Sequence, residues 1–349
     1  LHSALGYNQT VPTDLALLQR MAESVEARRP MLDPEHAAAL RLFNGFYEGW
    51  PGLVVDLYGR SLVVFNHADP PDDLQPSIPA VLAGLREQLP WLKAVLVKNR
   101  NSTNPADRRG VLAYGGPLDR RICERGVWYA IDLTMNQDAS FYLDTRALRF
   151  WLQANLAGKS VLNTFAYTGS LGAAARAGGA GPVLQTDRSA RFLDLARETW
   201  VLNGWPLNPR DFQSGDFYRV VAALKSQRRL FDCLILDPPF FSTSPSGRVD
   251  LLAGGQHLIN KVRPLVADGG WLVAVNNALF LSGADYLNAL QALCADGFMA
   301  LAELIPVPED VTGLAVERAA SLPADPAPFN HPTKIAILRV RRKDQAPAR

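Results

Sequence analysis

The sequence predicts an α/β fold with a mostly parallel sheet in its second half, and two stretches carry this prediction. Residues 159–188 read as a buried strand, a glycine turn, an alanine-rich helix and a second strand that ends in Asp187. Residues 230–242 read as another buried strand, followed by Asp237-Pro238-Pro239-Phe240. Strand–helix–strand units build parallel sheets, whose ligand crevice lies beyond the carboxyl ends of the strands. We therefore expect the functional site at these strand ends.

The glycine turn favours one class of cofactor over another. Gly169 permits backbone angles that a side chain would forbid, and it lets a ligand approach the main chain. A dinucleotide fingerprint needs a further closely spaced glycine for the pyrophosphate, and this turn has only Gly169 and Gly172. S-adenosylmethionine has no phosphate, and Asp187 suits a ribose diol because a carboxylate accepts hydrogen bonds from both hydroxyls. An ordinary crossover without a ligand is the alternative interpretation.

The Asp-Pro-Pro-Phe sequence is the sharper signal. Two successive prolines fix the backbone and lack amide hydrogens, so nearby carbonyl groups remain free to face a ligand. Phe240 or Phe241 can stack on a flat base, and Asp237 with the loop carbonyls can hold an exocyclic amine or a ring nitrogen. A rigid turn without a ligand is again the alternative.

Together these motifs resemble the class I S-adenosylmethionine-dependent methyltransferases. They resemble more narrowly the bacterial large-subunit ribosomal RNA methyltransferases that modify cytosine C5 or guanine N7. The similarity rests on residues 163–169, Asp187 and residues 237–240, with support from residues 140–146 and 51–59, and it covers roughly residues 35–342. It implies a Rossmann-like methyltransferase domain with an antiparallel edge, preceded by a small α+β domain. It also implies S-adenosylmethionine as cofactor, S-adenosylhomocysteine as product and ribosomal RNA as partner.

The expected site residues fall into three groups. The catalytic group is Asp237, Pro238, Pro239 and Phe240. The residues expected to contact the cofactor are Asn163, Phe165, Ala166, Tyr167, Thr168, Gly169, Asp187, Arg188, Asp216 and Asp237. The residues expected to contact the substrate are Tyr142, Arg146, Phe241 and Asn277, and no metal site is expected. For Asp216, capping the helix that follows is an equally good interpretation.

Asn276-Asn277, at the end of a predicted strand, separates two chemistries. Cytosine C5 is a poor nucleophile, so its methylation needs a cysteine thiolate that attacks the ring. The cytosine-modifying relatives carry cysteine at this strand end, and the guanine-N7 relatives carry Asn-Asn. Guanine N7 already has a lone pair, so positioning it in line with the methyl group is the main requirement. We therefore expect N-methylation, with cytosine C5 as the alternative reaction and turn asparagines as the structural alternative.

Composition limits the class of protein. The chain has 349 residues, of which 48% are hydrophobic, and a formal net charge of +2, so contact with RNA must come from a local patch or from shape. Arg100, Arg108 and Arg109 in the polar loop 99–110 are the candidate phosphate patch, and a mobile surface loop is the alternative. The three cysteines are far apart, no apolar run has membrane-spanning length, and no signal peptide is recognisable. These features favour the cytoplasm.

The chain is expected to divide into three parts: a helical segment at 1–34, a small α+β domain at 35–135 and the methyltransferase domain at 136–349. Residues 41–66 read as consecutive antiparallel strands, and residues 243–255 as a mobile lid. Three rival functions remain open: a methyltransferase with a DNA, protein or small-molecule substrate, a non-catalytic RNA-binding module, and a nicotinamide-dependent oxidoreductase.

Overall fold

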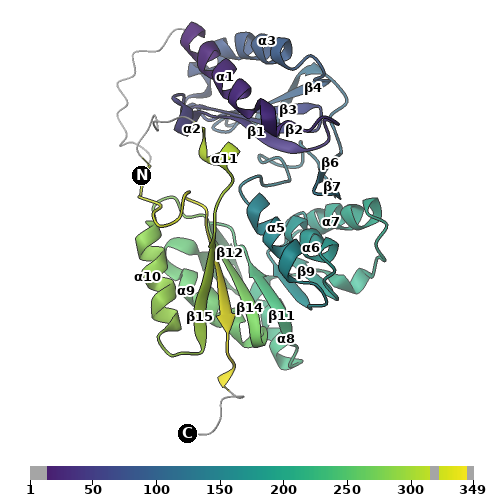
Figure 1. Ribbon diagram of the computed structural model, residues 1–349, viewed down its shortest axis with the longest axis vertical. Coiled ribbons are helices and arrows are strands. Elements are labelled where there is room, and N and C mark those ends of the chain that lie inside the picture. The colour runs from purple at the N-terminus through teal and green to yellow at the C-terminus, as the bar shows by residue number, and fades with distance from the viewer. Residues whose placement is uncertain (1–13, 315–321, 344–349) are drawn as a thin grey trace. The chain divides into compact units, whose positions relative to one another are not determined.

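The computed structural model describes residues 14–314 and 322–343, which form two compact units (Figure 1). The first unit comprises residues 14–119, 133–138 and 309–314, and the second comprises residues 120–132, 139–308 and 322–343. The boundaries of these two units differ from the domain boundaries that the sequence predicted at residues 34 and 135. The N-terminal helix packs into the first unit, and the chain enters the second unit at 120, leaves it at 133 and returns at 139. Residues 1–13 of the expected helical segment lie outside the described residues.

The first unit contains a five-stranded sheet with the order β1-β2-β3-β4-β5. Strands β1, β2 and β3 are antiparallel neighbours, β4 lies parallel to β3, and β5 is an antiparallel edge strand. The strands are β1 (Ala39–Asn44), β2 (Leu53–Tyr58), β3 (Ser61–Asn66), β4 (Ala94–Asn99) and β5 (Val111–Gly115). The helices are α1 (Asp14–Arg28), η1 (Arg29–Met31), α2 (Gly45–Glu48), η2 (Pro71–Asp73), η3 (Gln75–Ser77), α3 (Ile78–Gln88), α4 (Pro105–Arg109) and α11 (Glu309–Thr312).

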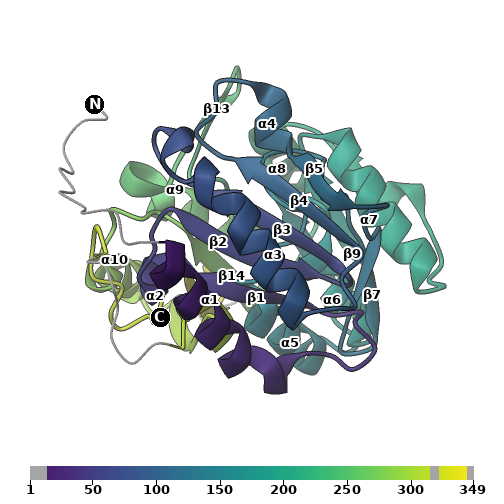
Figure 2. The same ribbon diagram turned by 90° about the horizontal axis from the view of Figure 1, so that it is seen from above.

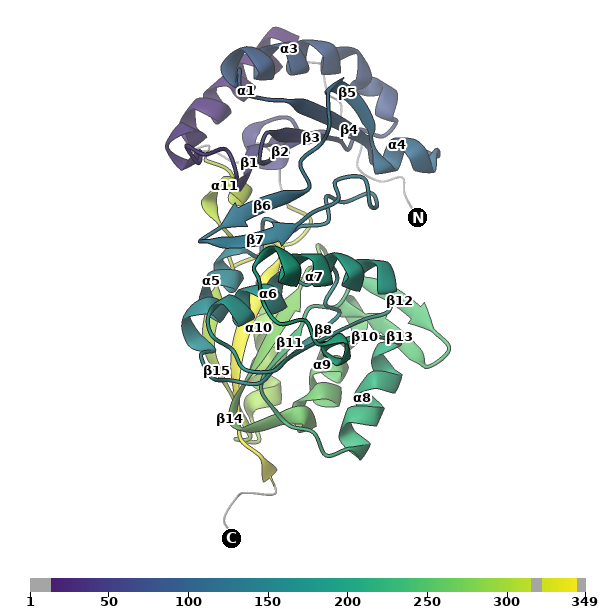
Figure 3. The same cartoon turned by 90° about the vertical axis from the view of Figure 1, so that its right-hand side faces the viewer.

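Helices α1 and α3 cover one face of this sheet (Figures 2 and 3). Leu17, Met21 and Val25 recur at three- and four-residue spacing on α1, and all are buried in the same apolar cluster as Val81 and Leu85 of α3. The core of this unit therefore lies between the two helices and the sheet.

The second unit contains a seven-stranded sheet with the order β10-β9-β8-β11-β14-β16-β15. The first five strands are parallel, and β16 and β15 form an antiparallel edge, as the similarity implied. The strands are β8 (Val161–Thr164), β9 (Val183–Asp187), β10 (Phe212–Ser214), β11 (Phe231–Leu236), β14 (Val266–Asn276), β15 (Met299–Ile305) and β16 (Lys334–Val340). The predicted α/β fold is therefore confirmed.

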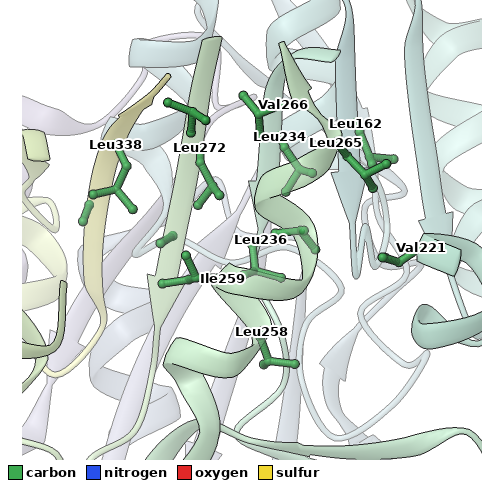
Figure 4. Packing of buried hydrophobic residues seen from close by; sticks show 14 of the residues in the cluster. Leu162, Val221, Leu234, Leu236, Leu258, Ile259, Leu265, Val266, Leu272 and Leu338 are labelled. Carbon is green, nitrogen blue, oxygen red and sulfur yellow. The ribbon is translucent and has the colours of Figure 1, made fainter. Parts of the chain in front are cut away.

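Helices cover both faces of this sheet. The helices are α5 (Arg146–Asn155), α6 (Ser170–Ala177), α7 (Ala190–Leu202), η4 (Pro209–Asp211), α8 (Phe217–Ser226), α9 (Leu251–Val262), η5 (Arg263–Leu265) and α10 (Gly283–Cys294). Apolar side chains of α8, α9 and α10 pack with those of the strands in one buried cluster, part of which is seen in Figure 4. Two hairpins complete the unit: β6 (Arg121–Glu124) with β7 (Val127–Ala130), and β12 (Phe241–Ser244) with β13 (Gly247–Asp250).

Three local predictions need correction in detail. The consecutive antiparallel strands predicted at 41–66 are confirmed as β1, β2 and β3, but residues 45–48 between β1 and β2 form the short helix α2. Part of the loop 99–110 is the helix α4, capped by the Asn104 side chain. The predicted lid at 243–255 is the hairpin β12–β13 and the start of α9, a pairing that its polar, glycine-containing sequence did not reveal.

Candidate functional site

The carboxyl ends of β8 and β11 define the site. The sheet order reverses at β8, because β9 lies on one side of it and β11 on the other. Helices that follow these strands therefore lie on opposite faces, and in open α/β sheets ligands bind between the loops at such a point. We call the region between these two loops the crevice. The loop after β8 contains Gly169, and the loop after β11 contains Asp237, so this crevice brings the two predicted motifs to one edge of the sheet.

The loop after β8 has an unusual backbone. Phe165, Tyr167 and Gly169 all have positive φ angles, of 52°, 50° and 79°. Only glycine adopts such angles without strain, so the two aromatic residues are held there by their surroundings. Phe165 stacks on Phe217 with ring centroids 4.5 Å apart, and the Tyr167 ring contacts Phe192 edge-on at 4.6 Å. Ala166, Thr168 and Gly169 of this loop are buried, whereas Phe165 and Tyr167 are half-buried.

Asp187 ends β9 and closes this loop. Its Oδ2 accepts a hydrogen bond from the Tyr167 backbone N–H at 2.9 Å, and its Oδ1 accepts one from the Ser189 N–H at 2.8 Å. Burial raises the pKa of the Asp187 carboxyl, and the backbone donors only partly offset this effect. The Arg188 N–H is a third backbone donor to this carboxyl, and the lone-pair capacity that remains can accept a hydrogen bond from a ribose hydroxyl.

Asn163 supports the loop from beneath. Its side chain is buried in β8, and Nδ2 donates to Oε1 of Gln185 at 3.2 Å. A Cβ atom at Gly172 would lie 2.4 Å from the same Oε1, and one at Gly169 would lie 2.5 Å from Ala196 Cβ. The Asn163 side chain therefore faces Gln185 below the helix start and has almost no surface of its own for a cofactor.

Thr168 joins the glycine loop to residues 139–146. Its hydroxyl donates to the Ser140 carbonyl at 2.6 Å, and the ring of Tyr142 lies 5.3 Å from that of Tyr167. Tyr142 is 43% exposed, so its ring remains available to a substrate. Ala166 continues the loop and its N–H donates to the Thr186 carbonyl, which fixes the turn to β9.

Asp237 follows β11 directly and has the strongest electrostatic perturbation of the predicted residues. Burial raises the pKa of its carboxyl to about 7, and the negative charge of Asp144 adds to the shift. Asp144 accepts a hydrogen bond from the Thr333 hydroxyl at 2.8 Å. The Asp144 charge thus acts on Asp237, whose pKa of about 7 puts its change of protonation near neutral pH.

The proline loop is tied to the end of β14. Pro238 is buried, whereas Pro239 and Phe240 are exposed. The Phe240 carbonyl accepts from the Leu251 N–H at 3.0 Å, and the Leu251 carbonyl accepts from Asn276 Nδ2 at 3.4 Å. Asn276 is buried and therefore holds the loop in place.

Asn277 is the exposed member of the pair, and the turn around it is fixed from the other side. Nζ of Lys334, which lies opposite Asn276 in the sheet, donates to the carbonyls of Ala278 and Pro332 at 3.0 and 2.6 Å. Burial lowers the pKa of this amine to about 8. The side chain of Asn277 is therefore presented from a rigid turn.

Of the remaining predicted residues, Phe241 and Arg188 have exposed side chains, whereas Asp216 is engaged as a helix cap. Phe241 is 50% exposed and lies under the Arg248 guanidinium at 4.8 Å. Arg188 is exposed and donates to the Thr243 carbonyl at 3.3 Å. Asp216 caps α8, because its Oδ1 accepts from the N–H groups of Tyr218 and Arg219. Burial raises the pKa of Asp216, but hydrogen bonds from Ser244, Arg219, Ser246 and Tyr218 outweigh this and lower it overall.

Arg146 does not present a free charge. Its Nε lies 3.3 Å from Glu124 Oε1, and Glu124 also pairs with the buried Arg149 at 2.5 Å.

In the first unit, two arginines of the predicted phosphate patch already have partners within the protein. Arg100 pairs with Asp138 at 2.6 Å, and Arg108 donates to the Ser102 and Thr103 carbonyls.

Sequence reasoning missed Thr333 and the contacts of Ser140, Asp144 and Asn276, although these three residues lie in segments that it had singled out. The Ser140 carbonyl accepts a hydrogen bond from the Thr168 hydroxyl, and the Asp144 charge raises the pKa of Asp237. The Thr333 hydroxyl donates to Asp144, and the Asn276 side chain donates to the carbonyl of Leu251 beside the proline loop. The charge of Asp144, next to an exposed tyrosine in a predicted site segment, was the one available signal. The others depend on contacts between distant parts of the chain.

None of the three cysteines lies at the crevice. Cys233 is buried in β11 opposite Val161, the first residue of β8, which puts it about 13 Å of strand before Asp237. Burial raises the pKa of its thiol, so it is a poor thiolate. Cys294 ends α10 and also has a raised pKa, and Cys123 lies in β6.

A family comparison agrees with this geometry. Residues 41–323 match the S-adenosylmethionine-dependent methyltransferase family. The chain belongs to this family. The matched range includes the glycine loop, Asp187, the Asp-Pro-Pro-Phe sequence and Asn276-Asn277.

Individual relatives of this methyltransferase are distant. It is 28% identical over 289 residues to the ribosomal RNA large subunit methyltransferase I of Aeromonas salmonicida, covering 82% of this chain and 72% of that protein. A Streptococcus mutans protein described as an S-adenosylmethionine-dependent methyltransferase has a TM-score of 0.80 at 20% identity, covering 95% of this chain and 83% of its own. A further structure, of the methyltransferase SMU.776 with S-adenosylhomocysteine, has a TM-score of 0.79 at 20% identity, with the same coverage. At this identity the two structures support the fold.

The cofactor of this methyltransferase is S-adenosylmethionine, and the site residues fit it. Asp187 has lone-pair capacity for a ribose hydroxyl, and the half-buried Phe165 and Tyr167 of the glycine loop leave surface for the cofactor. Within residues 14–314 and 322–343, no cluster of three or more His, Cys, Asp or Glu side chains is arranged to hold a metal ion. In the same part of the chain, no helix is both long and apolar enough to span a membrane.

Proposed function

We propose that this methyltransferase transfers the methyl group directly to a nucleobase nitrogen, guanine N7, in large-subunit ribosomal RNA. The observation that carries the choice of atom is the end of β14, where Asn277 is exposed and no thiol is present. The RNA assignment is supported by the name of the Aeromonas salmonicida relative and by the exposed aromatic rings at the crevice.

The cofactor supplies an electrophilic methyl group on a sulfonium, and the chain's own residues supply position and charge. Asp187 holds the ribose, and the backbone of Tyr167, Thr168 and Gly169 shapes the cofactor loop. The exposed rings of Phe240 and Phe241 stack on the base, which must leave any duplex to reach them. The Asn277 amide reads the base edge.

Asp237 has an electrostatic role in this proposal. Methylation of guanine N7 leaves a positive charge on the base, and a carboxylate at the proline loop stabilises that charge as it develops. Its ionised form also accepts a hydrogen bond from an exocyclic amine. No general base is required, because N7 carries no proton to remove.

The direct test is methyl transfer from labelled S-adenosylmethionine to total RNA from cells that lack this protein. The RNA is digested and its nucleosides are identified by mass. We expect N7-methylguanosine. Labelled 5-methylcytidine would overturn the choice of atom, and unlabelled RNA despite cofactor binding would overturn the RNA assignment.

A second test removes the thiols. A chain with Cys123→Ser, Cys233→Ala and Cys294→Ser should keep its rate of methyl transfer within about threefold, because no covalent attack by cysteine is needed. The matched variant Asn277→Ala should lower kcat/KM by about 10- to 100-fold, since one hydrogen-bonded base contact contributes about 1–3 kcal/mol. Loss of activity in the chain without thiols, with cofactor affinity retained, would indicate a cysteine nucleophile.

A further inference from the structure

A groove on the first unit lies outside the residues assigned to methyl transfer. It has a volume of about 560 Å³ and lies between α3 and the edge strand β5, with α4 at one end. We call it the α3–β5 groove. Figure 3 shows α3 over the sheet, with β5 at the sheet's edge and α4 close to β4. Small-ligand sites have volumes of about 300–1,000 Å³, so the groove is large enough for one nucleotide.

The groove exists because α3 does not cover the edge of the sheet. Ile78, Val81 and Leu85 of α3 are buried against the inner strands, but Val111 of β5 remains 53% exposed. A β-bulge lies beside it: Val95 pairs with Tyr114 and Leu96 pairs with Leu112, which leaves Ala113 unpaired. A bulge turns the neighbouring side chains away from their regular positions, and here Ala113 and Tyr114 both line the groove.

The groove contains a fixed flat cation. The Arg86 guanidinium lies over the Tyr114 ring, 3.7 Å from its centroid. Among the described residues, no carboxylate forms an ion pair with Arg86, so its charge and its N–H groups remain available. The outer face of a stacked guanidinium is a surface on which a nucleobase stacks well.

Polar groups that suit a base edge lie in the same groove. Asn99 uses its Oδ1 to accept from Asn66 at 3.0 Å, and within the described chain its Nδ2 has no acceptor. Asp107 accepts hydrogen bonds from Ser102 and Asn104, which fixes its carboxylate. An amide donor and a carboxylate acceptor together match a base that has both a ring acceptor and an exocyclic amine.

This combination selects among ligand classes. Asp107 would repel a free phosphate, and a purely apolar ligand would leave Arg86 and Asn99 without partners. Ile78, Leu82 and Val97 supply an apolar wall, which a base covers and a hydrated ion does not. The groove carries one positive and one negative side chain, so a heterocycle with donors and acceptors is the best match.

We propose that the α3–β5 groove binds an unpaired, amine-bearing nucleobase of the RNA substrate, stacked on Arg86. This inference rests on the proposed RNA function and adds a second point of RNA recognition. Adenine, cytosine and guanine carry the exocyclic amine that Asp107 accepts, and uracil does not. The groove therefore discriminates between single-stranded sequences.

Two exposed positions on α3 provide a matched pair of variants. Ala83 lines the groove and Glu87, about one helical turn further on, does not, so Ala83→Trp fills the groove and Glu87→Trp adds the same bulk outside it. The measurement is fluorescence anisotropy of labelled hexaadenylate and hexauridylate with the full chain. An unchanged circular dichroism spectrum and an unchanged thermal unfolding profile show that the first unit of each variant is folded.

The wild-type chain should bind hexaadenylate at least about fivefold more tightly than hexauridylate. Ala83→Trp should weaken hexaadenylate binding by about tenfold and remove the preference, as expected for the loss of one stacked base. Glu87→Trp should stay within about twofold of wild type. Arg86→Gln should also weaken hexaadenylate binding. The inference is overturned if Ala83→Trp binds hexaadenylate as the wild type does, or if the wild type does not discriminate.

Methylation assays separate this inference from the proposed function. If RNA is methylated, Ala83→Trp should raise KM for RNA about tenfold with kcat unchanged, and an unchanged KM overturns the groove assignment alone. If no RNA is methylated but Ala83→Trp still weakens hexaadenylate binding, the proposed reaction is overturned and the groove stands as an RNA site.

Discussion

At the scale of single residues, the protonation of Asp237 should set the pH dependence of methyl transfer. Its pKa is raised to about 7 by burial and by Asp144, so its ionised fraction increases as the pH rises through 7. If the ionised form is required, kcat/KM increases over the same range. Asp144→Asn removes the neighbouring negative charge, which lowers the pKa of Asp237 and should move the acidic limb about one pH unit down.

The measurement is the pH profile of kcat/KM from pH 5 to 9. Asp194→Asn on α7 is the matched control, because it removes an exposed carboxylate that pairs with Arg197 instead. Its profile should follow the wild type. An acidic limb that stays in place in Asp144→Asn would show that the Asp144 charge does not act on the ionisation that limits the reaction.

The same carboxyl should make stability depend on pH. The folded-state pKa of Asp237 lies above its ordinary value of 3.8, so the protonated form favours the folded state. This contribution is lost as the pH rises through about 7. Asp237→Asn is neutral at every pH, and it should raise the free energy of unfolding at pH 8.5 by on the order of 2 kcal/mol. Urea unfolding of the cofactor-free chain at pH 5 and pH 8.5 tests this, and equal effects at both values would contradict it.

The site residues that directly follow a strand could be predicted from the sequence. The residues that contact the site from distant parts of the chain could not. Asp187 and Asp237 stand directly after apolar strands, so the strand pattern alone indicates where they lie. Asp144 depends on Thr333, which is 189 residues further along the chain. Arg146 stands in a recognisable segment, but its partner Glu124 is in a separate hairpin. A single sequence carries no signal for such pairs.

At the scale of elements, the start of α6 depends on two glycines for different reasons. Gly172 lacks room for a Cβ because of the Gln185 side chain, at 2.4 Å. Gly169 has a φ of +79°, and a Cβ there would lie 2.5 Å from Ala196 Cβ and 2.8 Å from Gln185 Oε1, so it is restricted by its backbone as well as by its neighbours. Gly172→Ala should therefore destabilise the chain by about 1–3 kcal/mol and weaken cofactor binding.

A double-mutant cycle distinguishes these two causes. Gln185→Ala removes the clashing side chain, so combining it with Gly172→Ala should recover part of the loss, with a coupling of at least about 1 kcal/mol. It should recover little of the loss in Gly169→Ala, because the strained backbone remains. Thermal unfolding and calorimetric titration with S-adenosylhomocysteine provide the two measurements. Additive effects for Gly172 and Gln185 would contradict the steric explanation.

The predicted helices and strands were correct where a local sequence pattern marks their ends. The strand, turn, helix and strand at 159–188 were confirmed because apolar runs and Gly178 mark their ends. The hairpin β12–β13 was missed because its strands are short and only one of its residues, Val249, is buried. Without a buried face, the alternation that identifies a strand is absent from the sequence.

At the scale of the whole molecule, the unit edges depend on contacts that the sequence does not display. Residues 309–314 belong to the first unit although the chain around them belongs to the second. Arg28 of α1 donates to the Asp310 carbonyl at 2.9 Å, and Asn44 donates to the Val311 carbonyl at 2.6 Å. A domain boundary drawn along the sequence places this segment in the methyltransferase domain. Nothing in the segment's own composition indicates that it packs beside α1 and β1.

Each unit contains a buried arginine–glutamate pair, and these two pairs should affect function differently. Arg28 contacts Glu48 at 2.7 Å in the first unit, and Arg149 contacts Glu124 at 2.5 Å in the second. Removing one partner of a buried pair leaves an uncompensated charge, so Arg28→Met and Arg149→Met should each cost about 3–5 kcal/mol of stability. Arg149 also donates to the Tyr142 carbonyl and to the Thr145 hydroxyl, in the segment that reaches Thr168 through Ser140.

Only Arg149→Met should therefore weaken cofactor binding, by about tenfold or more, whereas Arg28→Met should leave the Kd for S-adenosylhomocysteine within about twofold. Scanning calorimetry measures the loss of stability, and isothermal titration at 15 °C, where both variants remain folded, measures affinity. Ligand at 100 times its Kd stabilises the unit that binds it by about 2.7 kcal/mol. It should thus raise the unfolding temperature of the second unit in Arg28→Met as it does in wild type. Equal loss of affinity in both variants would mean that the first unit also shapes the cofactor site.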